Sequence, residues 1–285
     1  MSNKESSLFV VTGAASGMGK ASAQRLGRRG RVLLADINAK QLDQVAKQLI
    51  SEGIEAKKQV CNVMDEQSVC LLAKTAKSLG QVSGIVNAAG ISPSMTTDWK
   101  KMLSVDLIGT ALILREFLPL IAPGGAAVCI ASIASRILKN DPEIDAILDN
   151  PQDHDFLKRI EPFLSISLPS TEVNPKSGAA YILAKRGVIR LCEKLAPLWA
   201  KHGARIVSVS PGTIDTPMGR QELDNLAYMR ESIEMTPMRR VGKPEEIASV
   251  VDFLCSEDAS FITGCDLLVD GGYTAAMTHL NTLQI

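Results

Sequence analysis

The stretch Thr12-Gly13-Ala14-Ala15-Ser16-Gly17-Met18-Gly19 joins an apolar run at residues 8–12 to an amphipathic segment that begins near Gly17. Glycines at this spacing let a chain turn tightly from a strand into a helix, and they let its backbone approach a phosphate closely. The free N–H groups at the amino end of that helix would then face the phosphate charge. The sequence therefore predicts a dinucleotide-binding turn made by Gly13, Ser16, Gly17, Met18 and Gly19.

Apolar runs and amphipathic segments alternate along most of the remaining chain. Runs that are apolar throughout are typical of parallel strands covered by helices on both faces. They occur at residues 8–12, 32–35, 85–88, 127–131, 205–209 and 266–269, with a weaker run at 56–60. This pattern predicts an α/β fold with a doubly wound, Rossmann-type parallel sheet of about seven strands. No repeat or linker marks a boundary, so we expect residues 1–285 to form one domain.

Composition excludes several classes of protein. With 31 basic and 31 acidic residues, the formal net charge is zero, which disfavours nucleic acid and anionic membranes as partners. No apolar stretch reaches transmembrane length, and the polar amino terminus lacks the apolar core of a signal peptide. The six cysteines are scattered singly, and the histidines do not cluster, so neither a disulfide framework nor a metal site is expected. We expect a cytoplasmic protein without a bound metal.

An acidic residue, Asp36, follows the second apolar run. In a dinucleotide fold, an acid at this point accepts hydrogen bonds from the ribose 2′-hydroxyl and repels a 2′-phosphate. Ser16, Ile37 and Asn38 supply no positive charge for such a phosphate. The sequence therefore predicts NAD as cofactor in preference to NADP, although a solvated aspartate that caps the next helix is a simpler alternative.

The glycine turn and Asp36 are followed, in order, by Val86-Asn87-Ala88-Ala89-Gly90, by Tyr181-Ile182-Leu183-Ala184-Lys185, and by Ser210-Pro211-Gly212 with Thr216. Together these motifs resemble the short-chain dehydrogenase/reductase family. The resemblance runs from the first strand to Leu268-Val269-Asp270-Gly271-Gly272 near the end of the chain. The segment 130–135, the long interruption before Tyr181 and the tail after Gly272 look most like the bacterial 3α-hydroxysteroid dehydrogenase/carbonyl reductase group.

The resemblance implies a proton-transfer site around Tyr181. A phenol has a pKa of about 10, so it is a poor base near neutral pH unless a cation stabilises its ionised form. Lys185 lies four residues later, on the same helical face, and can supply that cation. By the resemblance, Tyr181 exchanges the proton of the alcohol and Lys185 also holds the nicotinamide ribose. Ser132 would hydrogen-bond the substrate oxygen, with Ser135 as the rival serine.

The resemblance also implies which residues border the cofactor. Asp36 and Ile37 would lie at the adenosine ribose, and Asn62 with Val63 beside the adenine. Residues at the end of the fourth strand would position the cofactor and leave room for its ribose, and a later segment would border the nicotinamide. These two groups are Asn87, Ala88 and Gly90, and Pro211, Gly212, Ile214 and Thr216.

One position departs from the family pattern. The family's fourth catalytic residue is an asparagine on the helix after the fourth strand, and Asp106 stands in its place, within Ser104-Val105-Asp106-Leu107-Ile108-Gly109. A carboxylate can hold a water molecule near Lys185, but it adds negative charge and lacks the amide's donor. The sequence leaves open whether Asp106 replaces the asparagine in a proton relay.

Residues 136–175 interrupt the alternation of strands and helices. Asp141-Pro142-Glu143 is typical of a helix start, and Asp153 could cap a second helix. We expect an ordered insertion of two short helices, which buries its apolar faces at the rim of the active site or against a partner subunit. A disordered surface loop is the alternative. The apolar residues are Ile144, Ile147 and Leu148 in the first helix, and Phe156, Leu157 and Ile160 in the second.

These patterns predict an NAD-dependent oxidoreductase that interconverts a secondary alcohol and its ketone. Residues 217–238 carry adaptable apolar side chains that suit a mobile lid over a lipophilic or hydroxysteroid-like substrate, although they could simply pack on the sheet. The alternatives are a catalytically silent dinucleotide-binding regulator and an NADP-linked ketone reductase.

The helix expected at residues 177–200 is apolar around much of its circumference, more than one sheet face requires. The resemblance implies that this helix packs against its counterpart in a second subunit. We therefore expect a homodimer or a homotetramer, and a dimer if the inserted helices obstruct that contact.

Overall fold

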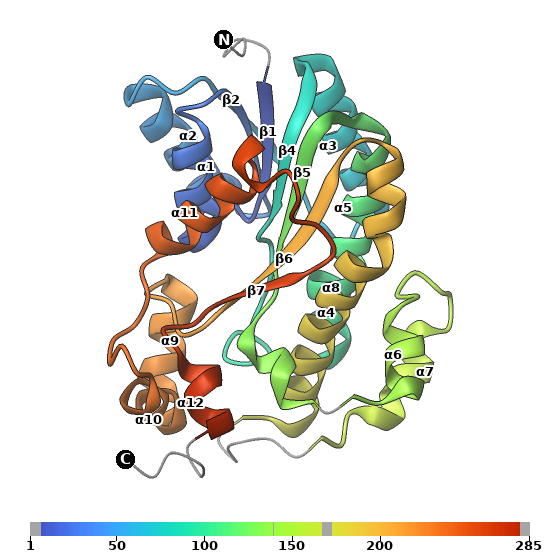
Figure 1. Cartoon of the computed structure of the whole chain (residues 1–285), viewed down its shortest axis with the longest axis vertical. Coiled ribbons are helices and arrows are strands. Elements are labelled where there is room, and N and C mark those ends of the chain that lie inside the picture. Colours follow the sequence, from blue (N-terminus) through green and yellow to red (C-terminus); the bar gives the residue numbers. More distant parts are fainter. Residues whose placement is uncertain (1–6, 139, 167–172, 280–285) are drawn as a thin grey trace.

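The computed structural model describes residues 7–138, 140–166 and 173–279 of the chain. Within them, one seven-stranded parallel sheet has the order β3-β2-β1-β4-β5-β6-β7 (Figure 1). The predicted fold class, a single doubly wound α/β domain, is confirmed. The strands are β1 (Ser7–Thr12), β2 (Arg31–Asp36), β3 (Ala56–Val60), β4 (Gln81–Asn87), β5 (Ile121–Ile130), β6 (Arg205–Pro211) and β7 (Asp266–Val269).

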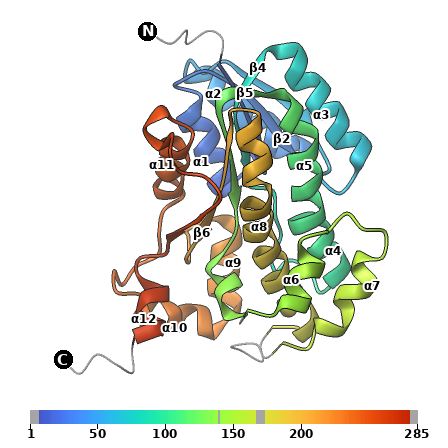
Figure 2. The same cartoon turned by 45° about the vertical axis from the view of Figure 1, so that its right-hand side comes forward.

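Two hydrophobic cores lie on opposite faces of this sheet. In β1, Leu8 and Val10 join one core, and the alternate residues Phe9 and Val11 join the other. Because both faces are covered, successive strand residues are apolar, as the sequence shows. Figures 1 and 2 show α1, α2 and α11 on one side and α3, α5 and α8 on the other. These helices are α1 (Gly17–Leu26), α2 (Ala39–Ser51), α3 (Glu66–Leu79), α5 (Gly109–Phe117), α8 (Pro175–Lys201) and α11 (Pro244–Leu254).

The strand order reverses at β1, which pairs with β2 on one side and β4 on the other. At such a reversal, the helices that follow the two neighbouring strands lie on opposite faces of the sheet. The carboxyl ends of these two strands therefore border a crevice. A buried hydrogen bond from Thr12 Oγ1 to Asn87 Oδ1, 2.7 Å long, ties these two strand ends together. The predicted glycine turn and the predicted segment after β4 therefore lie side by side.

The helix after β4 changes its winding where it carries Asp106. An α-helix, α4 (Trp99–Leu103), passes into a π-helical turn, Ser104–Ile108, before α5 begins. A π-helical turn alters which way its residues point and frequently marks a functional site. Asp106 is 1% exposed, and its carbonyl accepts a 2.8 Å hydrogen bond from Thr110 Oγ1. The sequence analysis did not predict this turn.

The insertion forms two short helices, α6 (Pro142–Leu148) and α7 (Phe156–Ile160). Asp141 caps α6 as expected, accepting from the Glu143 N–H at 2.9 Å. The expected cap at Asp153 is wrong: α7 begins after Asp155, and Asp153 instead pairs with Arg159 at 3.2 Å. The reason is that the chain makes another turn before the helix starts. Residues 139 and 167–172 of the segment lie outside the described residues. Leu157 of the insertion is half-buried. The other apolar residues expected on its two helices are buried in the core that also contains residues of α8: Ile144, Ile147, Leu148, Phe156 and Ile160.

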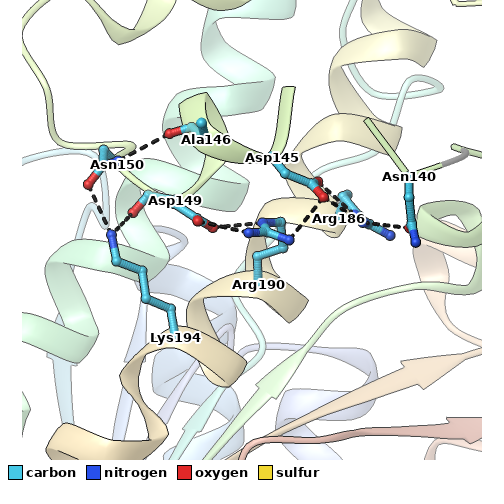
Figure 3. A network of polar contacts seen from close by, with 8 residues as sticks. All are labelled: Asn140, Asp145, Ala146, Asp149, Asn150, Arg186, Arg190 and Lys194. Carbon is cyan, nitrogen blue, oxygen red and sulfur yellow. Dashed lines mark hydrogen bonds and ion pairs between the residues drawn. The ribbon is translucent and has the colours of Figure 1, made fainter. Parts of the chain in front are cut away.

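A ladder of polar contacts fastens the insertion to α8 (Figure 3). Arg186, Arg190 and Lys194 recur every fourth residue, so they share one face of the helix. Arg186 pairs with Asp145 at 3.0 Å, and Arg190 bridges Asp145 and Asp149 at 3.0 and 2.7 Å. Lys194 donates to the Asp149 carbonyl at 2.7 Å. This face of α8 is therefore used within the chain and is covered by α6.

Three helices gather beyond the carboxyl ends of the strands (Figure 1). Two of them, α9 (Pro217–Asn225) and α10 (Ala227–Met235), come from the segment expected to be a lid. The third, α12 (Tyr273–His279), follows the last strand. In the described part of the chain, no helix has both the length and the apolar character needed to cross a bilayer.

Candidate active site

The glycine turn after β1 forms a tight cradle at the start of α1. Gly13 has φ +67°, and a Cβ atom there would lie 2.6 Å from the carbonyl group of Ala88. A Cβ on Gly19 would lie 2.2 Å from the Gly13 oxygen, so neither position admits a side chain. Ser16 is the N-cap residue of α1, and Gly17 and Met18 follow it. Because the first N–H groups of a helix have no partner within it, this cradle fits a pyrophosphate.

Asp36 stands beside the cradle, at the carboxyl end of β2. Its Oδ2 accepts from the Ala15 N–H at 3.0 Å, and its Oδ1 accepts from the Asn38 N–H at 2.9 Å. In the described residues Asp36 makes no ion pair, and the next side chain, Ile37, is 64% exposed. An ionised carboxylate can accept about four hydrogen bonds, so both oxygens retain capacity. The residues present therefore fit the ribose hydroxyls of a dinucleotide.

Other predicted cofactor residues use their side chains within the protein. Asn87 is 4% exposed, and its Nδ2 donates to Thr110 Oγ1 at 2.8 Å. Asn62 Oδ1 accepts from the Met64 N–H at 3.1 Å, and Val63 packs in the core. These side chains hold the backbone at the ends of β3 and β4. Asn87 thereby positions the neighbouring backbone of Ala88.

Lys185 and Asp106 form a buried ion pair behind the predicted catalytic tyrosine. Lys185 Nζ lies 3.3 Å from Asp106 Oδ2, donates to the Ile130 carbonyl at 3.3 Å, and lies 5.6 Å from the centre of the Tyr181 ring. Asp106 Oδ1 accepts from the Ile91 N–H at 2.8 Å. Burial raises the pKa of Asp106, while Lys185 and this N–H oppose the rise. The residue at the asparagine position thus contacts the predicted catalytic lysine directly.

Gly90 leaves the space that this ion pair needs. A Cβ on Gly90 would lie 3.3 Å from Lys185 Nζ and 3.4 Å from Asp106 Oδ1. The contact with Lys185 Nζ would be tight, whereas the contact with Asp106 would be an ordinary one. The strand end that carries the predicted cofactor residues therefore also shapes the buried pair.

The Tyr181 hydroxyl lies between opposing electrostatic influences. Burial does most to raise the pKa of Tyr181, followed by the negative charge of Glu222, while a hydrogen bond with Ser132 lowers it. Asp106 and Tyr228 raise this pKa further. Two carboxylates thus oppose ionisation of the phenol, and one of them, Glu222, was not among the predicted site residues.

The structure distinguishes the two candidate serines. Ser132 follows β5, and its Oγ accepts from the Ala134 N–H at 3.2 Å and reaches the Tyr181 phenol. Ser135 is fully buried, and its hydroxyl donates to the Ser132 carbonyl at 2.7 Å. Only Ser132 of these two lines the cavity in front of the phenol.

A cavity of about 640 Å³ opens between the strand ends and the three helices α9, α10 and α12. This volume lies within the range of small-molecule sites, about 300–1,000 Å³. Apolar side chains line much of it, among them Ile133, Ile137, Met218, Met229 and Met277. The predicted residues at its wall are Met18, Ser132, Tyr181, Pro211, Gly212, Ile214 and Thr216. The structure therefore brings the predicted catalytic groups and the predicted nicotinamide border to one cavity.

Several lining residues belong to no motif. Glu222 comes from α9, Tyr273 and Met277 come from α12, and Arg136 comes from the turn after β5. Their only sequence signal was their place in the lid segment, in the tail or at the start of the insertion. Among the described residues, no group of three or more His, Cys, Asp or Glu side chains could hold a metal ion.

Comparisons with known proteins agree with this geometry. Residues 7–140 match the family model described as short chain dehydrogenase, and residues 163–274 match the model described as Enoyl-(Acyl carrier protein) reductase. The short-chain dehydrogenase/reductase bsc3 of Alternaria brassicicola is 35% identical over 278 residues, which cover 96% of this chain and 97% of that protein. Cyclohexanol dehydrogenase of Acinetobacter sp. (strain SE19) is 30% identical, with 96% and 98% covered.

A solved structure from Brucella melitensis, of a short-chain dehydrogenase/reductase described as glucose/ribitol dehydrogenase, has a TM-score of 0.74 and 26% identity, and the match covers 96% of this chain and 99% of that one. These similarities extend over almost the whole chain and include every strand of the sheet. The resemblance that the motifs suggested is confirmed at the level of the family, and the finer subgroup is not. The chain belongs to the short-chain dehydrogenase/reductase family, oxidoreductases that act on alcohols and ketones with a nicotinamide dinucleotide.

Proposed function

We propose that this protein is an NAD-dependent oxidoreductase that interconverts a lipophilic secondary alcohol and its ketone. The observation that carries the proposal is the meeting of Ser132 and Tyr181 at one cavity, with Lys185 behind the phenol. The many methionines of the cavity wall favour an apolar carbon skeleton, because their side chains adapt to its shape. A cyclic, hydroxysteroid-like alcohol is our preferred substrate, and the name of the Acinetobacter relative supports a cyclic one.

The roles of the side chains follow from their positions. Bound NAD would supply the acceptor for the hydride of the alcohol. Ser132 would hydrogen-bond the substrate oxygen and direct it to the phenol, and Tyr181 would accept the hydroxyl proton in oxidation and return it in reduction. Lys185 would support the ionised phenol and hold the nicotinamide ribose. Asp36 and the glycine turn would hold the adenosine end.

Two segments complete this proposal. Residues 217–238 would act as the substrate lid, since α9 and α10 contribute side chains to the cavity wall. The insertion, residues 136–175, would stabilise α8 from its outer side through the ladder at Arg186, Arg190 and Lys194. Tyr181 and Lys185 lie on this same helix, so its position determines theirs.

A panel of secondary alcohols and ketones, assayed by NADH and NADPH absorbance, tests the proposed function. We expect turnover of cyclic alcohols with NAD. Tight NAD binding without any turnover would instead identify a silent regulator, an alternative favoured only by the aspartate at position 106. Turnover mainly with NADPH would identify the NADP-linked reductase.

Asp36→Ala should narrow the preference for NAD over NADP. The substitution removes a carboxylate that would accept hydrogen bonds from the ribose hydroxyls of NAD. Because a hydrogen bond to a charged group contributes about 1.5–3 kcal/mol, the ratio of kcat/KM with NAD to kcat/KM with NADP should fall about tenfold or more. The ratio of kcat/KM for the two cofactors measures this. Asn38→Ala, at the neighbouring helix cap, should leave the ratio nearly unchanged. Better use of NADP by the unmodified protein would contradict the cofactor assignment.

Tyr181→Phe should abolish most turnover while the fold stays intact. The ring remains, but the transferable proton is lost, and positioned proton transfer contributes about 10²–10⁴-fold to a rate. Single-turnover kinetics with the best alcohol of the panel, together with NADH fluorescence titration, separates chemistry from cofactor binding. Ser135→Ala is the matched control and should retain far more activity, because Ser135 does not line the cavity. Near-normal turnover by the phenylalanine variant would remove Tyr181 from the proposed role.

Asp106→Asn should keep substantial activity and move the pH profile. The amide retains an oxygen for the Ile91 N–H, whereas the lost negative charge no longer raises the pKa of Tyr181. The rise of kcat/KM for oxidation with pH should therefore shift to lower pH, with Lys185, Glu222 and Tyr228 still facing the phenol.

Asp106→Ala supplies the contrast, because it removes both the charge that pairs with Lys185 and the oxygen that accepts from the Ile91 N–H. Both variants break the buried ion pair, which costs about 3–5 kcal/mol, but only alanine also leaves the Ile91 N–H without its acceptor, so urea denaturation should show a larger loss of stability for alanine than for asparagine. Complete inactivity of a well-folded Asp106→Asn would show that the carboxylate itself is essential to the reaction.

We also propose that the protein is a homodimer that pairs through the β7 edge of the sheet. In the described residues β7 pairs only with β6, Phe261 before it is fully exposed, and Leu268 on it is 42% exposed. Since α6 covers one face of α8, that face is closed to a second subunit.

Light scattering should show a dimer, and Phe261→Asp should shift it toward the monomer. Leu71→Asp, at another exposed site on α3, should not, and a monomeric unmodified protein would contradict the proposal.

A further inference from the structure

Glu222 is an uncompensated charge in the wall of the cavity. The charged side chains among the described lining residues are Arg136 and Glu222. Arg136 is already paired with Asp266 at 2.6 Å, and the Asp266 side chain is only 4% exposed. Glu222 makes no ion pair anywhere in the described residues. Burial raises the pKa of Glu222, so its surroundings replace few of the water contacts that a carboxylate needs.

The segment of α9 that carries Glu222 contacts the loop after β4. A hydrogen bond from Ser92 lowers the pKa of Glu222 in part, and Ser92 is itself fully buried, with its Oγ 2.8 Å from Ser94 Oγ. The preceding residue, Gln221, donates to the Ser94 carbonyl at 3.0 Å. This part of α9 is therefore tied to the loop after β4 beside the cavity.

Glu222 and Tyr181 line the same cavity, whereas Asp106 and Lys185 do not. The charge of Glu222 also raises the pKa of Tyr181 more than the charge of Asp106 does. Glu222 thus acts on the phenol from the side where the substrate would bind, and the Lys185–Asp106 pair lies behind it. A substrate whose reacting oxygen meets Ser132 and Tyr181 would have its other atoms in the cavity that Glu222 also lines.

We propose that Glu222 binds a second hydroxyl group of the substrate, so that the preferred substrates are diols and their hydroxy ketones. This inference rests on the proposed function. A hydroxyl can donate to a carboxylate and can accept from a carboxylic acid, so it suits Glu222 in either protonation state. An ammonium group only donates, and it suits the ionised state alone. The apolar wall, including Met218 and Met229, would hold the carbon skeleton between the two oxygens.

The test compares matched substrates under one set of conditions. The probes are cyclohexanol, the cis and trans isomers of cyclohexane-1,2-diol, and 2-aminocyclohexanol, each oxidised with NAD. For the unmodified protein, kcat/KM should be about 10–100-fold higher for the better diol than for cyclohexanol, the range expected for a hydrogen bond to a charged group.

Glu222→Leu should bring the diol to cyclohexanol ratio close to one, and Glu222→Gln should keep part of it, because the amide still offers an oxygen. Glu231→Leu is the control: Glu231 is an exposed glutamate on the neighbouring α10 that does not line the cavity, and its variant should keep the unmodified ratio. Melting curves and NADH titration show whether each variant is folded and binds cofactor. If Glu222→Leu does not fold, the comparison of Glu222→Gln with the unmodified protein decides.

An unmodified protein that oxidises cyclohexanol and the diols equally well overturns this inference and leaves the proposed function standing. A ratio unchanged in both Glu222 variants also overturns it. A preference for 2-aminocyclohexanol over the diols that Glu222→Leu abolishes overturns the assignment to hydroxyl groups in favour of a cation. Absence of turnover with every alcohol and ketone of the panel overturns the proposed function together with the inference.

Discussion

The reversal of strand order between β1 and β4 is the constraint on which the site depends. Parallel strands with helices on both faces bring all their carboxyl ends to one edge, and the reversal opens that edge between β1 and β4. Thr12, Asn87 and Thr110 then form a buried polar chain that ends at the carbonyl of Asp106. This chain connects β1, β4 and α5, so one set of hydrogen bonds holds the glycine turn and the backbone of Asp106 behind the proposed active site.

The electrostatics of the site differ from those of a lysine acting alone on a tyrosine. A buried ion pair gains little net stability, because the cost of removing both charges from water offsets their attraction. Here Lys185 pairs with Asp106, whose negative charge raises the pKa of the Tyr181 phenol, and Glu222 adds a second negative charge on the cavity side. The ionised phenol is therefore disfavoured in the free protein. A substrate hydroxyl near Glu222 would compensate part of that effect.

The insertion supports α8, the helix that carries the proposed catalytic residues Tyr181 and Lys185. Its helix α6 uses the same four-residue spacing as α8, so Asp145 and Asp149 match Arg186 and Arg190 in register. Such partly buried, bridged pairs are more specific in geometry than single surface pairs, which contribute about 0–1 kcal/mol. Apolar residues of the insertion, such as Leu148 and Phe156, enter the core beside α8. Support from within the chain thus replaces part of what a neighbouring subunit could provide.

The roles expected of Tyr181 and Lys185 came from the resemblance to the family, whereas local patterns in the sequence determined the fold class, the strand positions, the glycine turn and the place of Asp36. They could do so because turn geometry, side-chain periodicity and a four-residue helical spacing depend on near neighbours alone. The approach of α9 and α12 to the strand ends depends on packing between segments far apart in the chain, so Glu222 and Met277 became site residues only in the tertiary structure. The same holds for the π-helical turn that carries Asp106 to Lys185. The resemblance to the family already favoured Ser132 over Ser135, and the tertiary structure adds that Ser135 is buried and bonded to the Ser132 carbonyl. The incorrect cap at Asp153 has a local cause, since Asp153 pairs with Arg159 six residues later and the chain makes another turn before α7 begins.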